Sequence, residues 1–181
     1  MVGDSISAGY GLPDVREGWV SLLGDSLDPH VHQVINVGIS GETTAGGLDR
    51  LPRLLSKYGP NYVIIELGGN DGLRGISLAE MERNLRAMIA LVRNASSTPV
   101  LLGMQLPPNY GKPFATAFEA VYPRIAKELH VVLVNGFMQG IGDVPDLMQA
   151  DQIHPNVKAQ PLLKDKVLKS LLPLIHSTPP H

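Results

Sequence analysis

Five apolar residues with a regular spacing mark the clearest helix in the chain. Leu78, Met81, Leu85, Met88 and Val92 are separated by 3, 4, 3 and 4 residues, the spacing of one face of an α-helix. The stripe predicts a helix that packs against a core rather than one that forms a port for lipid. Shorter apolar patterns predict four more helices, in residues 19–27, 48–55, 114–129 and 162–171.

Short apolar runs between these segments have the character of strands. They are VHQVINV (31–37), NYVIIEL (61–67), PVLLGM (99–104) and VVLV (131–134), and Met1-Val2 forms the stub of a first strand. The first two runs end at glycine and indicate strands buried on both faces. Strands that alternate with helices predict βαβ crossovers and a parallel sheet covered on both sides.

The size and composition of the chain indicate one globular domain spanning residues 1–181. The 181 residues are 44% hydrophobic, which is enough to bury a core, and no linker or internal repeat interrupts them. We expect residues 177–181, which end in Pro-Pro-His, to form a frayed tail.

Charge and residue usage exclude several classes of function. The formal net charge is −2 and no basic block is present, so nucleic acid is not an expected partner. No apolar run is long enough to span a bilayer, and no signal peptide begins the given chain, so we expect no stable membrane insertion. Cysteine is absent, and the histidines lack ligand spacing, so no metal site is expected. Composition leaves the cellular location open.

Polar residues directly follow the predicted strands. In a parallel sheet the carboxyl ends of the strands lie at one edge, where ligands bind, so these strand exits are expected to lie close together. Asp4 and Ser5 follow the stub of the first strand. The other exits carry Gly38, Ser40, Gly41 and Glu42, then Gly68, Gly69, Asn70 and Asp71, and, after a long loop, Asp151, Gln152, Ile153, His154 and Pro155.

These exits contain the parts of a serine-nucleophile enzyme. A serine hydroxyl needs a general base, which an imidazole oriented by a carboxylate provides, and Ser5, His154 and Asp151 fit those roles. A tetrahedral oxyanion needs donors, for which the N–H groups of Ser5 and Gly41 and the amide of Asn70 are candidates.

Each segment also has an ordinary structural interpretation. Gly3-Asp4-Ser5 and Gly68-Gly69-Asn70-Asp71 have the composition of turns, with Asp4 bonding its own backbone. Ser40-Gly41-Glu42-Thr43-Thr44 has the composition of a helix entry. An Asp and a His three residues apart are a common surface pair. The functional interpretation rests on the order and placement of all four segments together.

The four segments match, in order, the blocks of the SGNH hydrolases, also called the GDSL esterase family, whose name letters fall on Ser5, Gly41, Asn70 and His154. The segments GDSISAGYGL, NVGISGETTAGGLDRLPRLL, ELGGNDGLRG, LPPNYG and DQIHPN resemble a bacterial group of the family with thioesterase, protease and lysophospholipase activities. The resemblance covers essentially the whole chain.

The resemblance implies a three-layer α/β/α, flavodoxin-like fold with a five-stranded parallel sheet. It implies that Ser5 is the nucleophile, His154 the base and Asp151 its orienting carboxylate, with the oxyanion held by Ser5, Gly41 and Asn70. Members hydrolyse acyl esters and thioesters, small-molecule substrates, without a cofactor. We therefore expect a periplasmic or secreted enzyme that acts as a monomer.

The chain departs from the family pattern at three places. Ile6 replaces the leucine of the family name and keeps an apolar side chain. Gln152 stands where relatives often have glycine and affects the loop between Asp151 and His154. Only Met1 and Val2 precede the Gly-Asp-Ser, so the first strand is expected to be clipped.

An apolar groove for the acyl chain is expected at the same edge of the sheet. Its candidate residues are Leu73, Ile76, Leu106, Pro107, Tyr110 and Ile153, although ordinary surface or core packing also explains them. Among relatives the segment 72–78 is a loop that moves over bound acyl chains, and its two glycines permit that here.

Two alternatives to a lipid-type acyl hydrolase follow from the same residues. The first is a carbohydrate acetyl-esterase, because the family includes such enzymes. The second is a binding module that keeps the acyl groove but turns over slowly, because the clipped strand or Gln152 disturbs the alignment.

Overall fold

The architecture is built around a four-stranded parallel sheet in the computed structural model, which describes residues 1–177. The strands β1 (Val2–Gly3), β2 (Tyr62–Glu66), β3 (Thr98–Leu102) and β4 (Val132–Val134) are neighbours in that order. β2 and β3 consist mainly of β-branched and leucine residues that are buried, as expected for strands covered on both faces. All carboxyl ends therefore point to one edge of the sheet, where the predicted polar exits lie.

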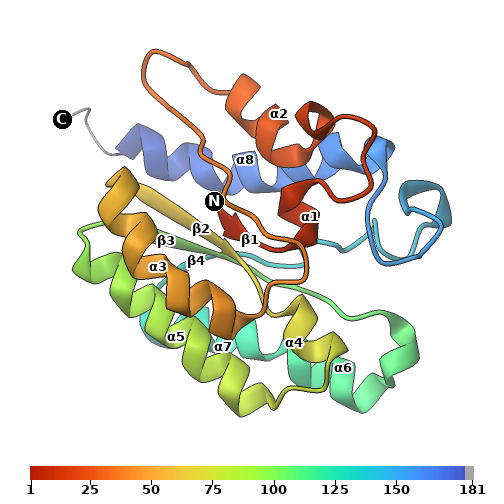
Figure 1. The fold of residues 1–181 in the computed structure, drawn as a ribbon. Helices are drawn as coiled ribbons and strands as arrows, with labels where there is room; N and C mark the ends of the chain where they lie inside the picture. The colour runs from red at the N-terminus through yellow and green to blue at the C-terminus, as the bar shows by residue number, and fades with distance from the viewer. Residues whose placement is uncertain (178–181) are drawn as a thin grey trace.

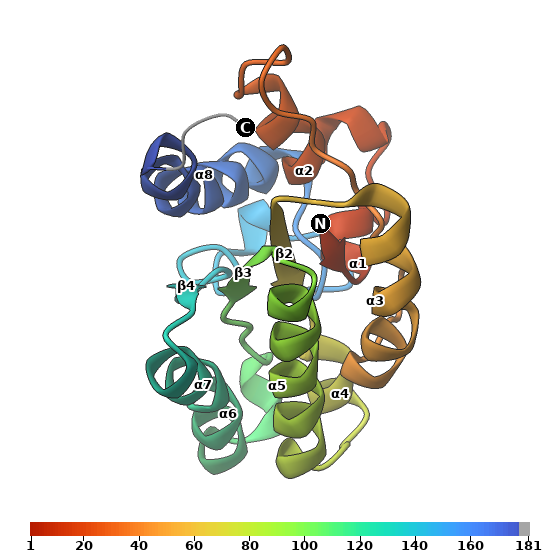
Figure 2. The same ribbon diagram turned by 90° about the vertical axis from the view of Figure 1, so that its left-hand side faces the viewer.

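Helices cover both faces of the sheet and give the predicted three-layer α/β/α fold (Figure 1). α2 (Trp19–Asp25) and α8 (Gln160–Ser177) lie on one face, while α3 (Thr44–Tyr58), α5 (Leu78–Asn94) and α7 (Val121–Leu129) lie on the other (Figure 2). The shorter helices are α1 (Ser5–Ala8), α4 (Gly69–Leu73) and α6 (Lys112–Glu119). Single 3₁₀ turns span Val15–Glu17, Pro108–Tyr110, Pro145–Leu147 and Val157–Ala159.

The helix predicted most clearly is α5, and its apolar stripe is in the core. Met81, Leu85, Met88 and Val92 are fully buried, because this face packs against the sheet and α3. Ser77 caps the helix by accepting a hydrogen bond from the Glu80 N–H. The stripe therefore serves packing, as the spacing predicts.

The predicted helix over residues 114–129 is two helices, α6 and α7, which meet at Ala120. Pro123 has no N–H to donate to the Glu119 carbonyl one turn earlier, and α6 ends at Glu119. The apolar period continues through both helices, which is why the pattern alone predicts one.

Residues 31–37 do not form the predicted buried strand, and the sheet has four strands instead of five. This segment is an extended edge: Val31 is 60% exposed, and hydrogen bonds join Val37 N–H to Met1 C=O, Ile39 N–H to Gly3 C=O and the Met1 amino group to Ile35 C=O. β1 spans two residues and offers too little backbone for a full ladder. With this segment as an edge strand, the order would be the flavodoxin-like 2-1-3-4-5, whose switch point lies at the end of β1.

The end of the chain differs slightly from expectation. α8 continues to Ser177, the first residue of the predicted tail, and residues 178–181 lie outside the described residues. Within residues 1–177, none of the helices combines the length and apolar character needed to cross a bilayer.

Gln160 joins α2 and α8 to the loop that follows the predicted catalytic histidine. Its buried side chain accepts a hydrogen bond from the Trp19 N–H at 3.0 Å, because the residue before α2 is Gly18, which has no side chain to cap the helix. Its Nε2 donates to the carbonyls of Pro155 and Asn156, each at 3.2 Å. One side chain of α8 thus satisfies polar groups of two other segments, the start of α2 and the loop after His154.

Replacing Gln160 with alanine is expected to lower the free energy of unfolding by about 1–3 kcal/mol, because buried donors and acceptors lose their partners. Urea denaturation measures the change. Gln33→Ala, at an exposed position, is the matched control. Equal stability of the two variants would contradict this role of Gln160.

Candidate active site

Ser5, His154 and Asp151 form a continuous hydrogen-bonded chain. Ser5 Oγ lies 2.8 Å from His154 Nε2, and His154 Nδ1 lies 2.6 Å from Asp151 Oδ2. The Asp151 carboxylate only accepts, so Nδ1 carries the proton and Nε2 is left to accept from the Ser5 hydroxyl. Residues 149 positions apart in sequence are thereby brought into the arrangement that activates a serine.

Hydrogen bonds within its own loop fix the Asp151 side chain and stabilise its ionised form. Its Oδ1 accepts hydrogen bonds from the backbone N–H groups of Ile153 and His154, both at 3.0 Å. Partial burial raises the pKa of Asp151, but these hydrogen bonds together with that from the His154 ring outweigh it and lower the pKa to about 2. Asp151 is therefore ionised throughout the range in which imidazole works as a base.

Gln149 and Tyr10 hold the loop that contains His154 against α1, and neither was among the predicted site residues. Gln149 N–H donates to the His154 carbonyl at 2.8 Å, and Gln149 Nε2 donates to the carbonyls of Tyr10 at 2.8 Å and Pro155 at 3.1 Å. The Tyr10 ring packs on the His154 ring with centroids 4.6 Å apart. Because Tyr10 follows α1 closely, this contact fixes the imidazole relative to Ser5.

Ser5 is the first residue of α1, immediately after β1. Asp4 Oδ1 accepts the Ile6 N–H at 3.0 Å and caps the helix, which is the structural role expected for Asp4. Gly9 ends the helix with φ +73, a left-handed conformation that glycine adopts without strain. The Ser5 N–H is one of the helix-start amides that make no bond within the helix and remain available to an acceptor.

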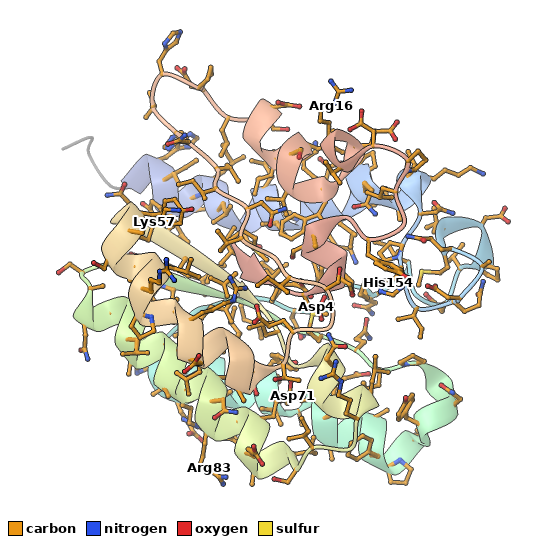
Figure 3. The ribbon with its side chains drawn as sticks, in the orientation of Figure 1. Asp4, Arg16, Lys57, Asp71, Arg83 and His154 are labelled. Atoms are coloured by element: carbon orange, nitrogen blue, oxygen red, sulfur yellow. The ribbon has the colours of Figure 1, made fainter. Side chains whose placement is uncertain are left out.

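Asp4 and Glu66 form a buried carboxyl pair next to the serine (Figure 3 labels Asp4). Glu66 Oε2 accepts hydrogen bonds from the Ser7 hydroxyl at 2.6 Å and the Asp4 N–H at 3.1 Å. Burial raises the pKa of Asp4 to about 6, and burial together with the Asp4 charge raises the pKa of Glu66 well above its usual range. Burial and the neighbouring Asp4 charge therefore favour the protonated form of Glu66.

Asn70 lies in α4, directly against Asp4. Its Nδ2 donates to Asp4 Oδ2 and to the Glu42 carbonyl, both at 3.1 Å. The segment read as a turn from its composition is thus the start of a short helix that follows Gly68, whose φ is +114. The same helix is fixed by Asp71, which accepts hydrogen bonds from the N–H and the hydroxyl of Thr44.

Gly41 occupies a turn beside α4 and adopts φ +78. The Glu42 N–H donates to the Ile39 carbonyl across the turn at 3.1 Å, and a positive φ at the third position is what a type II turn requires. Arg74 Nη2, from the residue that ends α4, donates to the Gly41 carbonyl at 2.8 Å. Sequence patterns did not indicate this arginine, whose contact is long-range.

A cavity of about 620 Å³ opens beside Ser5, Asn70 and His154. Its wall is mainly apolar, and it contains Ile6, Leu73, Met104, Leu106, Pro107, Met138, Met148 and Ile153. Four of the six predicted groove residues, Leu73, Leu106, Pro107 and Ile153, therefore border it.

Ile76 and Tyr110 are not among the residues that border the cavity. Tyr110 stands behind the wall, because its hydroxyl donates to the Leu73 carbonyl at 3.3 Å. Ile76 belongs to the turn after α4, where its N–H donates to the Asp71 carbonyl. Gly41 does not border the cavity either; its turn lies beside Asn70.

No cluster of three or more histidine or acidic side chains suited to a metal occurs within residues 1–177. The side chains gathered at this edge offer a serine hydroxyl, an imidazole, a carboxylate and several amide donors.

Residues 1–161 match the profile of the GDSL-like Lipase/Acylhydrolase family. The chain belongs to this family. It is 48% identical to the esterase TesA of Pseudomonas aeruginosa over 97% of this chain and 88% of that protein. It is 43% identical to thioesterase 1/protease 1/lysophospholipase L1 of Escherichia coli K12, over 97% and 84% of the two chains. A crystal structure of the psychrotrophic esterase EstA from Pseudoalteromonas sp., inhibited by monoethylphosphonate, superposes with a TM-score of 0.88 at 42% identity, covering 97% of this chain and 96% of the other.

Membership in the acylhydrolase family makes the chain a hydrolase of acyl esters. The same solved relative supports the predicted three-layer fold at high structural similarity.

Replacing Glu66 with glutamine is expected to preserve folding, because burial favours the uncharged form of Glu66 and glutamine has the same shape without a charge, whereas Glu66→Ala loses about 2–4 kcal/mol through a cavity and unpaired polar groups. Because the pKa of Glu66 is raised in the folded state, the folded chain releases this proton at a higher pH than the unfolded chain, which releases it near about pH 4.3. Wild-type stability should therefore fall relative to Glu66→Gln as the pH rises from about 5 to about 8. Denaturation at several pH values measures this; parallel curves would show that Glu66 is ionised in the fold.

Proposed function

We propose that this chain hydrolyses acyl esters and thioesters through an acyl-enzyme formed on Ser5. The observation that carries the proposal is the hydrogen-bonded chain from Ser5 through His154 to Asp151, with distances of 2.8 and 2.6 Å, at the mouth of an apolar cavity. Family membership supports the same reaction class.

In the first step Ser5 Oγ attacks the acyl carbonyl carbon while its proton moves to His154 Nε2. The ionised Asp151 stabilises the resulting imidazolium, which agrees with its lowered pKa of about 2. The imidazolium then gives that proton to the leaving alcohol or thiol as the bond to the carbonyl carbon breaks.

The negative oxygen formed during attack is stabilised by amide donors. The N–H groups of Ser5 and Gly41 and the side chain of Asn70 take this role, because all three belong to short elements that meet at the carboxyl end of β1. Asn70 Nδ2 has two N–H bonds, which donate to Asp4 and to the Glu42 carbonyl, so one of them must leave its present acceptor to reach the oxyanion.

In the second step water attacks the acyl-enzyme. His154 removes a proton from this water, the carboxylic acid leaves, and the proton returns to Ser5 Oγ. Every proton is exchanged between Ser5, His154, the leaving group and water, so the cycle balances without a cofactor.

The apolar wall of the cavity supports acyl chains longer than acetyl as substrates. A volume of about 620 Å³ and three buried methionines, Met104, Met138 and Met148, suit a flexible hydrocarbon chain better than a sugar. The names of two relatives, a thioesterase with lysophospholipase activity and an esterase, point to the same substrate class. A carbohydrate acetyl-esterase would be favoured only by a preference for acetyl esters.

The proposal extends to the oligomeric state and the cellular location of the enzyme. We propose that one copy of the chain, as a single domain, contains the whole site, because Ser5, Asn70, Asp151 and His154 all come from it. A monomeric enzyme in the periplasm or outside the cell is consistent with the family resemblance. Analytical ultracentrifugation and cell fractionation test these two points.

Replacing Ser5 with alanine is expected to lower kcat/KM for p-nitrophenyl butyrate and octanoyl-CoA by roughly 10⁴-fold or more, because the nucleophile is lost. Steady-state kinetics on both substrates measure this. Ser26→Ala, at an exposed position in another element, is the control and should retain activity. Substantial turnover by a folded Ser5→Ala variant would overturn the proposal.

Replacing Asn70 with alanine is expected to lower kcat by roughly 10²- to 10³-fold with a small change in KM, since the donor acts mainly on the charged transition state. Separate determination of kcat and KM on p-nitrophenyl butyrate tests this. A variant with altered KM but normal kcat would assign Asn70 to substrate binding instead.

A further inference from the structure

Gln152 adopts a backbone conformation that its side chain does not favour. Its φ is +57, in the left-handed region that glycine and, less often, asparagine occupy. It stands between Asp151 and His154, in a turn in which its own N–H donates to the Gln149 carbonyl at 3.0 Å. A glycine would meet the same geometry without strain.

Two other non-glycine residues with positive φ within residues 1–177 have an evident structural reason. His130, with φ +49, ends α7, and Ser96, with φ +58, follows the end of α5. Left-handed residues commonly end helices, where they satisfy the last carbonyls. Gln152 ends no helix, so its strain requires another explanation.

The side chain of Gln152 lies at the mouth of the active-site cavity. It borders the cavity together with Ile153 and His154 and is exposed to solvent. Its Nε2 donates to the Gln149 carbonyl at 3.0 Å, which fixes the amide. Within residues 1–177, no donor is paired with its Oε1, so this oxygen is an oriented acceptor open to a ligand.

The position of His154 defines which part of a substrate lies near Gln152. In the proposed mechanism His154 Nε2 protonates the leaving group, so the leaving atom must come within hydrogen-bonding distance of it. The carbonyl oxygen of the substrate turns instead toward Ser5, Gly41 and Asn70. Gln152, two residues from His154, therefore borders the leaving-group side.

We propose that Gln152 binds the leaving group, with its Oε1 accepting a hydrogen bond from an amide N–H or a hydroxyl near the reacting atom. The proposal rests on the proposed function of the same site. It makes Gln152 a specificity residue for thioesters and esters whose alcohol or thiol carries such a donor. The strained turn then serves to present a side chain where glycine would present none.

Paired substrates that differ in one donor test the proposal. The thioester pair is the octanoyl thioester of N-acetylcysteamine, which has an amide N–H, and ethyl thiooctanoate, which has none. The ester pair is mono-octanoylglycerol and propyl octanoate, which differ in hydroxyl groups. The two pairs distinguish an amide donor from a hydroxyl donor.

Gln152→Gly is expected to lower kcat/KM by about 3- to 10-fold for the donor-bearing member of at least one pair, the loss that one hydrogen bond commonly produces, and to change the other member less than about two-fold. Gln152→Glu retains an acceptor but loses the Nε2 donor that fixes the side chain to the Gln149 carbonyl, so it should restore only part of the discrimination. Gln152→Gly should also raise Tm by about 2–4 °C through relief of strain.

Ser96→Gly is the matched control, because it removes a side chain from the same left-handed conformation far along the chain from the cavity. It should raise Tm without changing discrimination within either pair. If Gln152→Gly raises Tm like Ser96→Gly but leaves both ratios unchanged, Gln152 is only a strained loop residue and the inference is wrong.

Results that contradict the proposed function differ from those that contradict the role of Gln152. A wild-type chain that hydrolyses neither thioester would contradict the thioesterase part of the proposal, while the ester pair would still decide the role of Gln152. Hydrolysis that survives in Ser5→Ala would contradict the mechanism itself, whatever the ratios of the Gln152 variants.

Discussion

The buried carboxyl group of Asp4 is the constraint on which the site depends. It accepts hydrogen bonds from the start of α1 through the Ile6 N–H and from α4 through Asn70, while its own N–H is bound to Glu66 at the end of β2. Three elements therefore meet on one residue, next to Ser5. Burial raises the pKa of Asp4 to about 6, which means that the ionised carboxylate is destabilised in the fold. Its hydrogen bonds nevertheless fix Ser5 and the Asn70 amide relative to one another.

A second, independent support holds the base. The loop from Gln149 to Pro155 closes on itself through Asp151, and Gln149 attaches it to Tyr10. Tyr10 closely follows α1, and its ring packs on the His154 ring. The base, although distant in sequence, is therefore positioned by the same short helix that carries the nucleophile. The geometry of catalysis is thus set by two small hydrogen-bonded junctions and not by the sheet alone.

The spacing of apolar residues predicted the helices and strands whose side chains are buried in the core. α5 follows from its stripe, β2 and β3 from their apolar runs, and the site from polar residues placed after strands. The pattern failed at residues 31–37, four of which are β-branched, because only the two residues of β1 are available to pair with them. Gln149, Arg74 and Glu66 were missed because their roles lie in contacts with residues distant in sequence, which no spacing reveals.

The central claim is that Ser5 attacks while donors from three separate segments receive the oxyanion. The most direct test is a crystal structure of the chain after reaction with diethyl p-nitrophenyl phosphate, which mimics the tetrahedral intermediate. The account predicts phosphorus bonded to Ser5 Oγ and one phosphoryl oxygen within about 3 Å of the N–H groups of Ser5 and Gly41 and of Asn70 Nδ2. Phosphorus on another residue, or an oxygen directed away from Gly41 and Asn70, would contradict it.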